Sequence, residues 1–149
     1  KAILEKGARL RERFLGLIDE DAEAFGPLSQ AYAIPKDDPA RETVMAKALE
    51  DASGAPLEIM RFCCEAIDLL AEILDKGSVM LVSDVGCGAL FCKAALRGAS
   101  LNVFINTKSF PDRGKAKALE AEADAMLQKY TALAEQIAGE VENRIRRED

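Results

Sequence analysis

Residues 81–106 read LVSDVGCGALFCKAALRGASLNVFIN, and this stretch decides which fold the chain can adopt. Most of its residues are small or apolar, so we expect it to be buried. It nevertheless carries Asp84, Asn102 and Asn106, and buried polar groups cost free energy unless they are hydrogen-bonded. Their partners must be either a neighbouring helix or a ligand.

Within this stretch we predict two helical elements, and we do not interpret the run VMLV at 79–82 as a strand, because nothing else in the chain offers a strand partner. Ser83 is a typical N-cap residue for a helix over 83–98, which Gly98 would end. The segment LNVFIN forms a second, short element, in which the two asparagines lie four residues apart and share a helix face. The preceding VMLV, residues 79–82, is expected to be a buried connector.

Helical periodicity continues on both sides of this stretch, because apolar residues recur every three or four positions. The further predicted helices span residues 1–33, 38–53, 55–77 and 112–147, the last of them capped by Asp112. Pro56 suits a first helical position and Gly54 suits a helix end, so we expect a boundary between them.

The chain is therefore predicted to be an all-α, single-domain bundle of long helices. The apolar stripe of the final helix indicates either a long antiparallel packing or a dimer seam. Several of the predicted helices are apolar on more than one face, which favours a symmetric homodimer that covers them.

Length and charge limit the classes of function. A chain of 149 residues is long enough to bury a core, and its 49% hydrophobic and 31% charged residues are ordinary for a soluble protein. No apolar run approaches the roughly 20 residues that cross a bilayer. The net charge of −6, with basic residues dispersed among acidic ones, argues against binding to nucleic acid or to anionic membranes.

The chain has four cysteines, Cys63, Cys64, Cys87 and Cys92, and no histidine. The cysteines form no CxxC pair, so we expect reduced core thiols in a cytoplasmic protein rather than a zinc site. The absence of histidine excludes Ser-His and Cys-His triads and histidine-ligated metals. Acid–base chemistry must therefore come from carboxylates, Lys, Tyr or Cys.

Asp21 is the first candidate site residue. It lies in the segment LIDEDAEAF, on the helix face that also carries Ile18 and Phe25, whereas Asp19 lies about half a turn away. The structural interpretation is a buried acid that pairs with an arginine or caps a helix. The functional interpretation is a catalytic carboxylate, because a buried carboxyl group holds its proton more tightly and suits proton transfer.

The segment SDVG, residues 83–86, is the second candidate. In the structural interpretation Ser83 caps the helix and Asp84 complements the helix dipole. In the functional interpretation the helix N-terminus receives a ligand, and Gly86 and Gly88 clear space for it. The glycines do not form a nucleotide-binding fingerprint, since no strand precedes them and the third glycine is absent.

Asn102 and Asn106 are the third candidate. Asparagine is a poor helix former and an expensive core residue. An amide offers a donor and an acceptor together, which suits the edge of a heterocyclic ligand. Hydrogen bonds from these amides to neighbouring backbone explain them equally well.

Taken in order along the chain, these motifs resemble the cyclodeaminase half of formiminotransferase-cyclodeaminase and the stand-alone methenyltetrahydrofolate cyclohydrolases of the same family. The resemblance rests on LIDEDAEAF, IPK at 34–36, PLE at 56–58, SDVG, and AALRGASLNVFIN at 94–106. It covers most of the chain, so residues 1–149 are expected to form one such domain. The family usually has a Pro- and Gly-rich segment before its first long helix, and we expect that segment to be missing here.

The resemblance implies an all-α homodimer that acts on a folate, with or without a polyglutamate tail. It implies a formiminotetrahydrofolate cyclodeaminase, which closes 5-formiminotetrahydrofolate to 5,10-methenyltetrahydrofolate and releases ammonia. The alternative is a methenyltetrahydrofolate cyclohydrolase, which adds water to the methenyl compound and gives 10-formyltetrahydrofolate. A non-catalytic folate-binding protein or a helical assembly protein is the third interpretation. No metal or redox cofactor is implied.

The resemblance also implies roles for individual residues. The catalytic carboxylate of the family corresponds to Asp21, which would move a proton during ring closure or activate water. Asp84 would hold the pterin or orient the group that carries the proton. The substrate-binding residues that the resemblance implies are Ser83, Gly86, Asn102 and Asn106.

Overall fold

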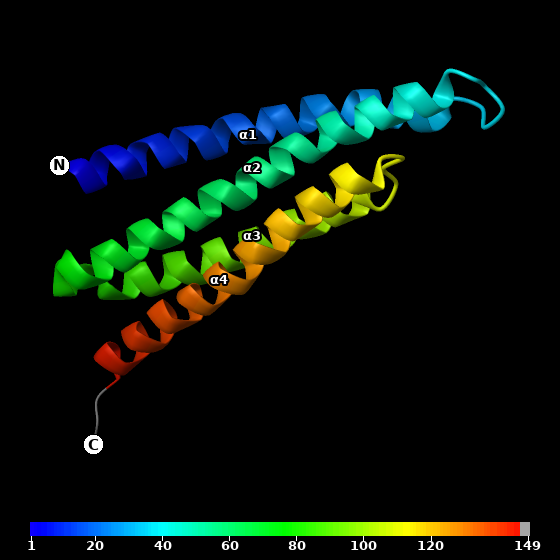
Figure 1. The fold of residues 1–149 in the computed structure, drawn as a ribbon. Coiled ribbons are helices and arrows are strands. Elements are labelled where there is room, and N and C mark those ends of the chain that lie inside the picture. The colour runs from blue at the N-terminus through cyan, green and yellow to red at the C-terminus, as the bar shows by residue number, and fades with distance from the viewer. Residues whose placement is uncertain (147–149) are drawn as a thin grey trace.

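The computed structural model describes residues 1–146 as four long α-helices joined by short turns (Figure 1). The helices are α1 (Ala2–Ala33), α2 (Arg41–Lys76), α3 (Val82–Thr107) and α4 (Arg113–Ile145), and a 3₁₀ turn, η1 (Val79–Leu81), precedes α3. No strand occurs within this described range. The prediction of an all-α bundle is therefore confirmed.

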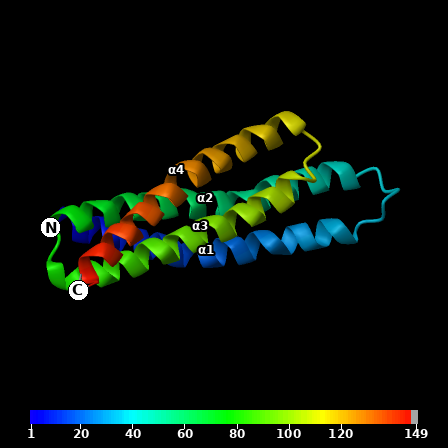
Figure 2. The same ribbon diagram turned by 90° about the horizontal axis from the view of Figure 1, so that it is seen from below.

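The helices run alternately up and down, so the N-terminus and the end of α4 lie at the same end of the bundle (Figures 1 and 2). Helix α2 is central and packs against α1, α3 and α4. Helices α3 and α4 also pack against each other, whereas the backbone of α1 approaches only α2 among the described helices. Helix α1 is therefore an edge helix, and a groove between α1 and α3 has α2 as its floor.

The main core lies where α2, α3 and α4 meet. Met60 and Ile67 of α2, Leu96 and Val103 of α3, and Ile137 of α4 are buried there. Burying one such side chain contributes roughly 1.5–3 kcal/mol, so these contacts decide how α4 packs. The apolar stripe of the last helix thus serves antiparallel packing within the chain, which is the first of the two predicted alternatives.

One continuous helix replaces the pair predicted over 38–53 and 55–77. Helix α2 passes through Gly54 without a break and contains Pro56 in its interior. The predicted boundary is wrong because both halves of α2 bury apolar side chains against neighbouring helices. This burial outweighs the cost of an interior glycine, which is about 1 kcal/mol relative to alanine.

One continuous helix also replaces the pair predicted over 83–98 and 101–106. Gly98 lies inside α3, where a side chain would meet open space, so the helix passes it without a break. Helix α3 begins at Val82, one residue before Ser83. Ser83 therefore lies in the first turn of α3 and is not its N-cap. The predicted buried connector is also wrong, since Val79 and the rest of η1 are exposed.

Asp112 caps α4 as predicted. Its Oδ1 accepts hydrogen bonds from the backbone N–H groups of Gly114 at 2.9 Å and Lys115 at 3.0 Å. These N–H groups have no partner inside the helix, so the cap stabilises the first turn of α4. Helix α4 ends at Ile145, and the predicted end near Arg147 lies outside the described residues.

All four cysteines are free thiols. Cys63 and Cys64 are buried in α2, and burial raises the pKa of each to about 12. Cys92 is partly buried, and burial raises its pKa as well. The prediction of four core thiols is wrong for Cys87, which α3 exposes to solvent.

Helix α3 together with η1 is unusually apolar. By length and composition alone, Val79–Thr107 meets the requirement for crossing a membrane: an 18-residue window has a mean hydropathy of 1.7 and is 22% buried. The prediction that no apolar stretch approaches such a length is therefore wrong. A mostly buried core helix of a soluble protein meets the same requirement by length and composition, but α3 packs against α2 and α4 on only part of its surface.

Candidate functional site

Three of the residues singled out in the sequence line one hollow in the groove between α1 and α3. Asp21 belongs to α1, and Asn102 and Asn106 belong to α3. The hollow has a volume of about 190 Å³. The other residues that line it are Phe25, Leu28, Ala52, Pro56 and Ile105. The fold therefore brings together two candidate segments that lie far apart in the sequence.

Asp21 is exposed, which contradicts the burial expected from its apolar helix face. The face is apolar, but it lies at the edge of the bundle because α1 packs only against α2. Neighbouring Glu20 forms the ion pair with Arg13, and within residues 1–146 Asp21 forms none. The predicted structural pairing with an arginine is thus absent there, and the carboxylate is available to a ligand in the hollow.

The amide of Asn106 is bonded to the backbone of α2. Its Nδ2 donates a hydrogen bond to the carbonyl oxygen of Ala52 at 3.1 Å. This carbonyl has lost its usual helical donor, because the residue four positions later is Pro56, which has no N–H. The structural interpretation, a hydrogen bond to neighbouring backbone, therefore accounts for the NH₂ group of the Asn106 amide. Asn102 lies one turn earlier on the same face and is exposed.

Ser83, Asp84 and Gly86 do not line this hollow. They lie in the first turns of α3, whereas Asn102 lies near its end, and about 18 residues at 1.5 Å each separate Asp84 from Asn102 by roughly 27 Å. Ser83 and Asp84 are both exposed. The fold therefore divides the predicted site and joins only the carboxylate of α1 with the two amides of α3.

Gly86 and Gly88 let helices approach each other closely. A Cβ atom at Gly86 would lie 2.7 Å from Cγ1 of Val141 in α4, and one at Gly88 would lie 3.1 Å from Cδ2 of Leu70 in α2. Carbon atoms pack at about 3.5–4.0 Å, so neither position has room for a side chain without movement. The functional interpretation, in which these glycines clear space for a ligand, is replaced by helix packing.

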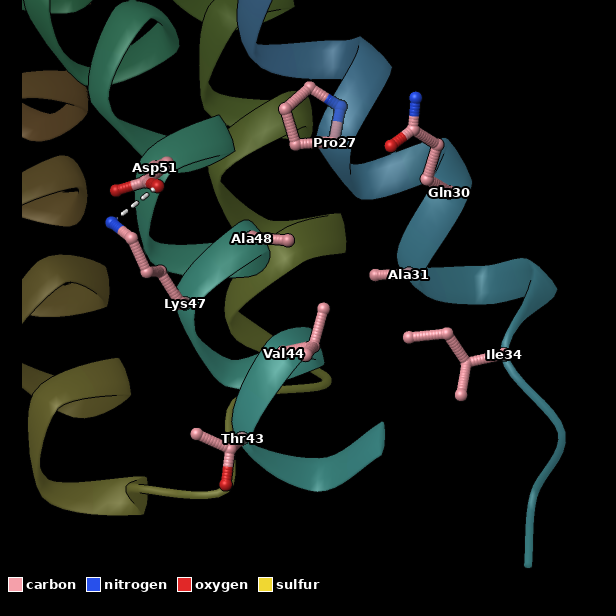
Figure 3. Close-up of a pocket in the computed structure, with 9 residues that line it drawn as sticks. All are labelled: Pro27, Gln30, Ala31, Ile34, Thr43, Val44, Lys47, Ala48 and Asp51. Carbon is pink, nitrogen blue, oxygen red and sulfur yellow. Dashed lines mark hydrogen bonds and ion pairs between the residues drawn. The ribbon is translucent and has the colours of Figure 1, made fainter. Parts of the chain in front are cut away.

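A larger hollow of about 630 Å³ lies at the end of the α1–α2 pair (Figure 3). Apolar side chains line both sides of it, with Ala31 of α1 and Ile34 directly after that helix on one side and Val44 of α2 on the other. Its charged residues are Lys47 and Asp51, which pair with each other at 2.9 Å. Because that carboxylate is already paired, the smaller hollow with its free Asp21 is the better candidate for proton transfer.

Phe25, Pro56 and Ile105 line the candidate site but were not among the residues singled out. The four-residue spacing between Asp21 and Phe25 places both on one helix face, so it could have identified Phe25 as a site residue. The sequence did not identify Pro56 as a site residue, because a proline normally indicates the start of a helix. Within residues 1–146 there is no group of three or more Cys, Asp and Glu placed to hold a metal ion.

The fold and the site define an all-α bundle with an open hollow between its helices, lined by a carboxylate and two amides that can form hydrogen bonds with a small polar ligand. Residues 1–125 match the family described as formiminotransferase-cyclodeaminase, and the chain belongs to this family. The resemblance seen in the sequence motifs is thereby confirmed.

Individual relatives represent two activities. The methenyltetrahydrofolate cyclohydrolase of Methylorubrum extorquens is 36% identical, and the match covers 97% of this chain and 72% of that protein. The formimidoyltransferase-cyclodeaminase of Mus musculus is 26% identical over 86% of this chain, which spans only 24% of that larger protein. The crystal structure of formiminotetrahydrofolate cyclodeaminase from Thermotoga maritima has the same fold, with a TM-score of 0.71 and 23% identity over 93% of this chain and 65% of that one.

Proposed function

We propose that this chain acts in folate one-carbon chemistry and that the pterin end of a tetrahydrofolate derivative enters the hollow between α1 and α3. The observation that carries the proposal is the placement of Asp21, Asn102 and Asn106 around one hollow. The names of the bacterial and mammalian relatives support a folate substrate. Asp84 has no part in the proposal, because it lies near the other end of α3.

The leading reaction is hydrolysis of 5,10-methenyltetrahydrofolate to 10-formyltetrahydrofolate. Water adds to the carbon between N5 and N10, and the carboxylate of Asp21 accepts a proton from that water. The bond from the carbon to N5 then breaks, and Asp21 returns the proton to N5. The hydroxyl group becomes the formyl carbonyl and releases its proton to solvent, so one proton is released for each water consumed.

Cyclodeamination of 5-formiminotetrahydrofolate is the second candidate, and identity to the mouse cyclodeaminase favours it. N10 attacks the carbon of the protonated formimino group and gives its proton to Asp21, which passes that proton to the amino nitrogen of the tetrahedral intermediate. The bond from the carbon to this nitrogen then breaks, ammonia leaves, and the methenyl cation remains. The relative named as a cyclohydrolase is more similar, at 36% identity against 26%. We therefore place hydrolysis first, which reverses the order drawn from the sequence motifs.

The test follows the absorbance of the methenyl compound with both substrates supplied separately. Loss of absorbance from 5,10-methenyltetrahydrofolate, faster than in buffer, indicates hydrolysis, and growth of absorbance from 5-formiminotetrahydrofolate indicates cyclodeamination. Asp21→Asn should lower the rate by about 10²–10⁴-fold, the usual contribution of a general acid–base residue. Asp19→Asn is the matched control, because Asp19 is also an exposed aspartate of α1.

Three outcomes contradict parts of this proposal. Full activity in Asp21→Asn would remove Asp21 from the mechanism. Inactivity of the unmodified chain with both substrates, combined with a rise in melting temperature on adding tetrahydrofolate, would indicate a folate-binding protein without catalysis. No activity and no rise in melting temperature would leave the helical assembly interpretation.

The proposal includes a homodimer that covers the groove. Ile18 and Phe25 of α1 and Leu101 and Ile105 of α3 are each more than half exposed, and Phe25 and Ile105 line the hollow itself. A second copy of the chain would remove this apolar surface from water. In analytical ultracentrifugation Leu101→Lys should shift the protein towards monomer.

Leu4→Lys is the control for the dimer, because Leu4 is also an exposed leucine but lies in the first turn of α1, away from the hollow. It should leave the sedimentation of the protein unchanged. A monomeric unmodified chain at micromolar concentration would refute the dimer.

A further inference from the structure

Pro56 leaves a gap in the hydrogen bonding of α2. In an α-helix each carbonyl accepts from the N–H four residues later, so the carbonyl of Ala52 should pair with residue 56. Proline has no N–H, and its ring disfavours a helix interior by about 3 kcal/mol or more. Ala52 and Pro56 are both buried, so water does not readily take the place of the missing donor.

The side chain of Asn106 provides the missing donor across the groove floor. Its Nδ2 lies 3.1 Å from the carbonyl oxygen of Ala52. A carbonyl oxygen only accepts hydrogen bonds, so the NH₂ group of the amide, and not its oxygen, must face α2. The orientation of the Asn106 amide is therefore determined by chemistry rather than by an arbitrary choice between its two ends.

This orientation leaves Oδ1 of Asn106 for the ligand. Asn106 lines the hollow, and within residues 1–146 no protein group donates to its Oδ1. No buried side-chain oxygen or nitrogen in that range lacks a partner, so this oxygen is accessible. The site thus presents a hydrogen-bond acceptor at this position and requires a donor from whatever binds there.

We propose that Pro56 is a positioning residue: by removing a helical donor, it fixes the Asn106 amide with its oxygen towards the hollow, so that the site selects a ligand with an N–H group there. The proposal rests on the folate site proposed above. The pyrimidine edge of a reduced pterin carries such donors, namely a 2-amino group and a ring N–H. Asn102 is not held by a hydrogen bond to α2, so its amide is free to turn.

The first experiment uses the ligand-free protein. Pro56→Ala restores a backbone N–H that competes with Asn106 for the carbonyl of Ala52. In ¹⁵N spectra of the side-chain amides, the Asn106 signal should differ from that of Asn102 and exchange its protons more slowly. In Pro56→Ala the Asn106 signal should move towards that of Asn102.

Pro27→Ala is the matched control, because Pro27 also interrupts the interior of a helix but is exposed and lies outside the hollow. It should leave both side-chain amide signals in place. An unchanged Asn106 signal in Pro56→Ala would overturn the proposal whatever the function of the protein.

A thermal denaturation cycle tests the same link through stability. Asn106→Leu leaves the buried carbonyl of Ala52 without a partner, so it should lower the melting temperature by about 5 °C in the unmodified chain. The loss should be clearly smaller in a Pro56→Ala background, where the helix supplies its own donor. Equal losses in both backgrounds would overturn the proposal, and the comparison remains informative even when single variants differ in stability.

The final experiment tests the requirement for a ligand donor. The unmodified protein should bind a reduced pterin at least tenfold more tightly than its 2-desamino, N3-methyl analogue, because that analogue lacks both donors and leaves the acceptor unpaired. In Pro56→Ala that ratio should fall several-fold, while kcat changes by less than about twofold and KM rises.

The binding result separates this proposal from the folate proposal. A ratio that stays the same in Pro56→Ala would refute the selection of an N–H donor. If the amide spectra are as expected but no folate binds, the proposed function is refuted, and with it the choice of a pterin as the ligand. The orientation of Asn106 by Pro56 is not refuted by that result.

Discussion

Gly86→Ala offers a sensitive test of how α3 packs. A Cβ atom added at this position would lie 2.7 Å from Cγ1 and 3.1 Å from Cβ of Val141. Rotation of the Val141 side chain cannot relieve the contact with its own Cβ, and a valine in a helix strongly prefers one rotamer. The helices α3 and α4 must therefore move apart, and overpacking of this kind costs about 1–3 kcal/mol.

Gly98→Ala is the matched control, because Gly98 lies in the same helix and a Cβ atom there meets nothing within 4 Å. Alanine should stabilise an open helical position by about 1 kcal/mol relative to glycine. Gly86→Ala gains the same amount but loses about 1–3 kcal/mol to the clash. The two variants should therefore differ by about 1–3 kcal/mol in the free energy of unfolding, with Gly86→Ala the less stable.

Urea denaturation of both variants measures this difference. Val141→Ala provides a further check, because it removes the contact with Cγ1 at 2.7 Å and leaves only the contact with Cβ at 3.1 Å, so Gly86→Ala should be less destabilising in that background than in the unmodified chain. If Gly86→Ala and Gly98→Ala stabilise the unmodified chain equally, the close approach of α3 and α4 is refuted. Gly86 would then again be a candidate for contact with a ligand.

Three further predictions concern the cap, the thiols and the core. Asp112→Ala should cost about 1 kcal/mol in urea denaturation, because two N–H groups of α4 lose their acceptor; an unchanged stability would contradict the cap. Burial raises the pKa of Cys63 from 9.0 to about 12, so the folded state favours the neutral thiol. Stability should therefore fall as the pH rises from about 9 towards 12, and iodoacetamide at pH 8 should modify Cys87 well before Cys63; equal rates of modification would refute the burial. Leu96→Ala should cost about 2–5 kcal/mol, whereas exposed Leu4→Ala should cost well under 1 kcal/mol; similar costs would contradict the assigned core.

The sequence predicted the helical class and one cap correctly because both depend on local properties. The three-to-four-residue spacing of apolar side chains is a property of a helix itself, whatever packs against it. Asp112 caps α4 through N–H groups two and three residues away, so its role is also local. Family motifs likewise follow directly from the order of residues.

Burial was predicted less well, because it depends on which neighbour covers a helix face. Asp21 lies on an apolar stripe, but α1 is an edge helix and leaves that residue exposed. Cys87 and Val79 lie in the most apolar stretch of the chain and are exposed for a similar reason. A periodic pattern indicates which residues share a face, but only the packing of the bundle decides whether that face is covered.

The sequence by itself determined that the chain is helical, which residues share a helix face, and which family motifs it contains. Only the tertiary structure decided that α2 continues through Pro56, because apolar side chains on both sides of this proline are buried against neighbouring helices. Asn106 of α3 then donates to the carbonyl that the proline leaves without its helical donor. The same contact brings the amides of α3 to the hollow that Asp21 also lines. The burial that keeps α2 continuous and the hydrogen bond that places Asn106 at the candidate site thus both join residues far apart in the chain, and local propensity contains neither.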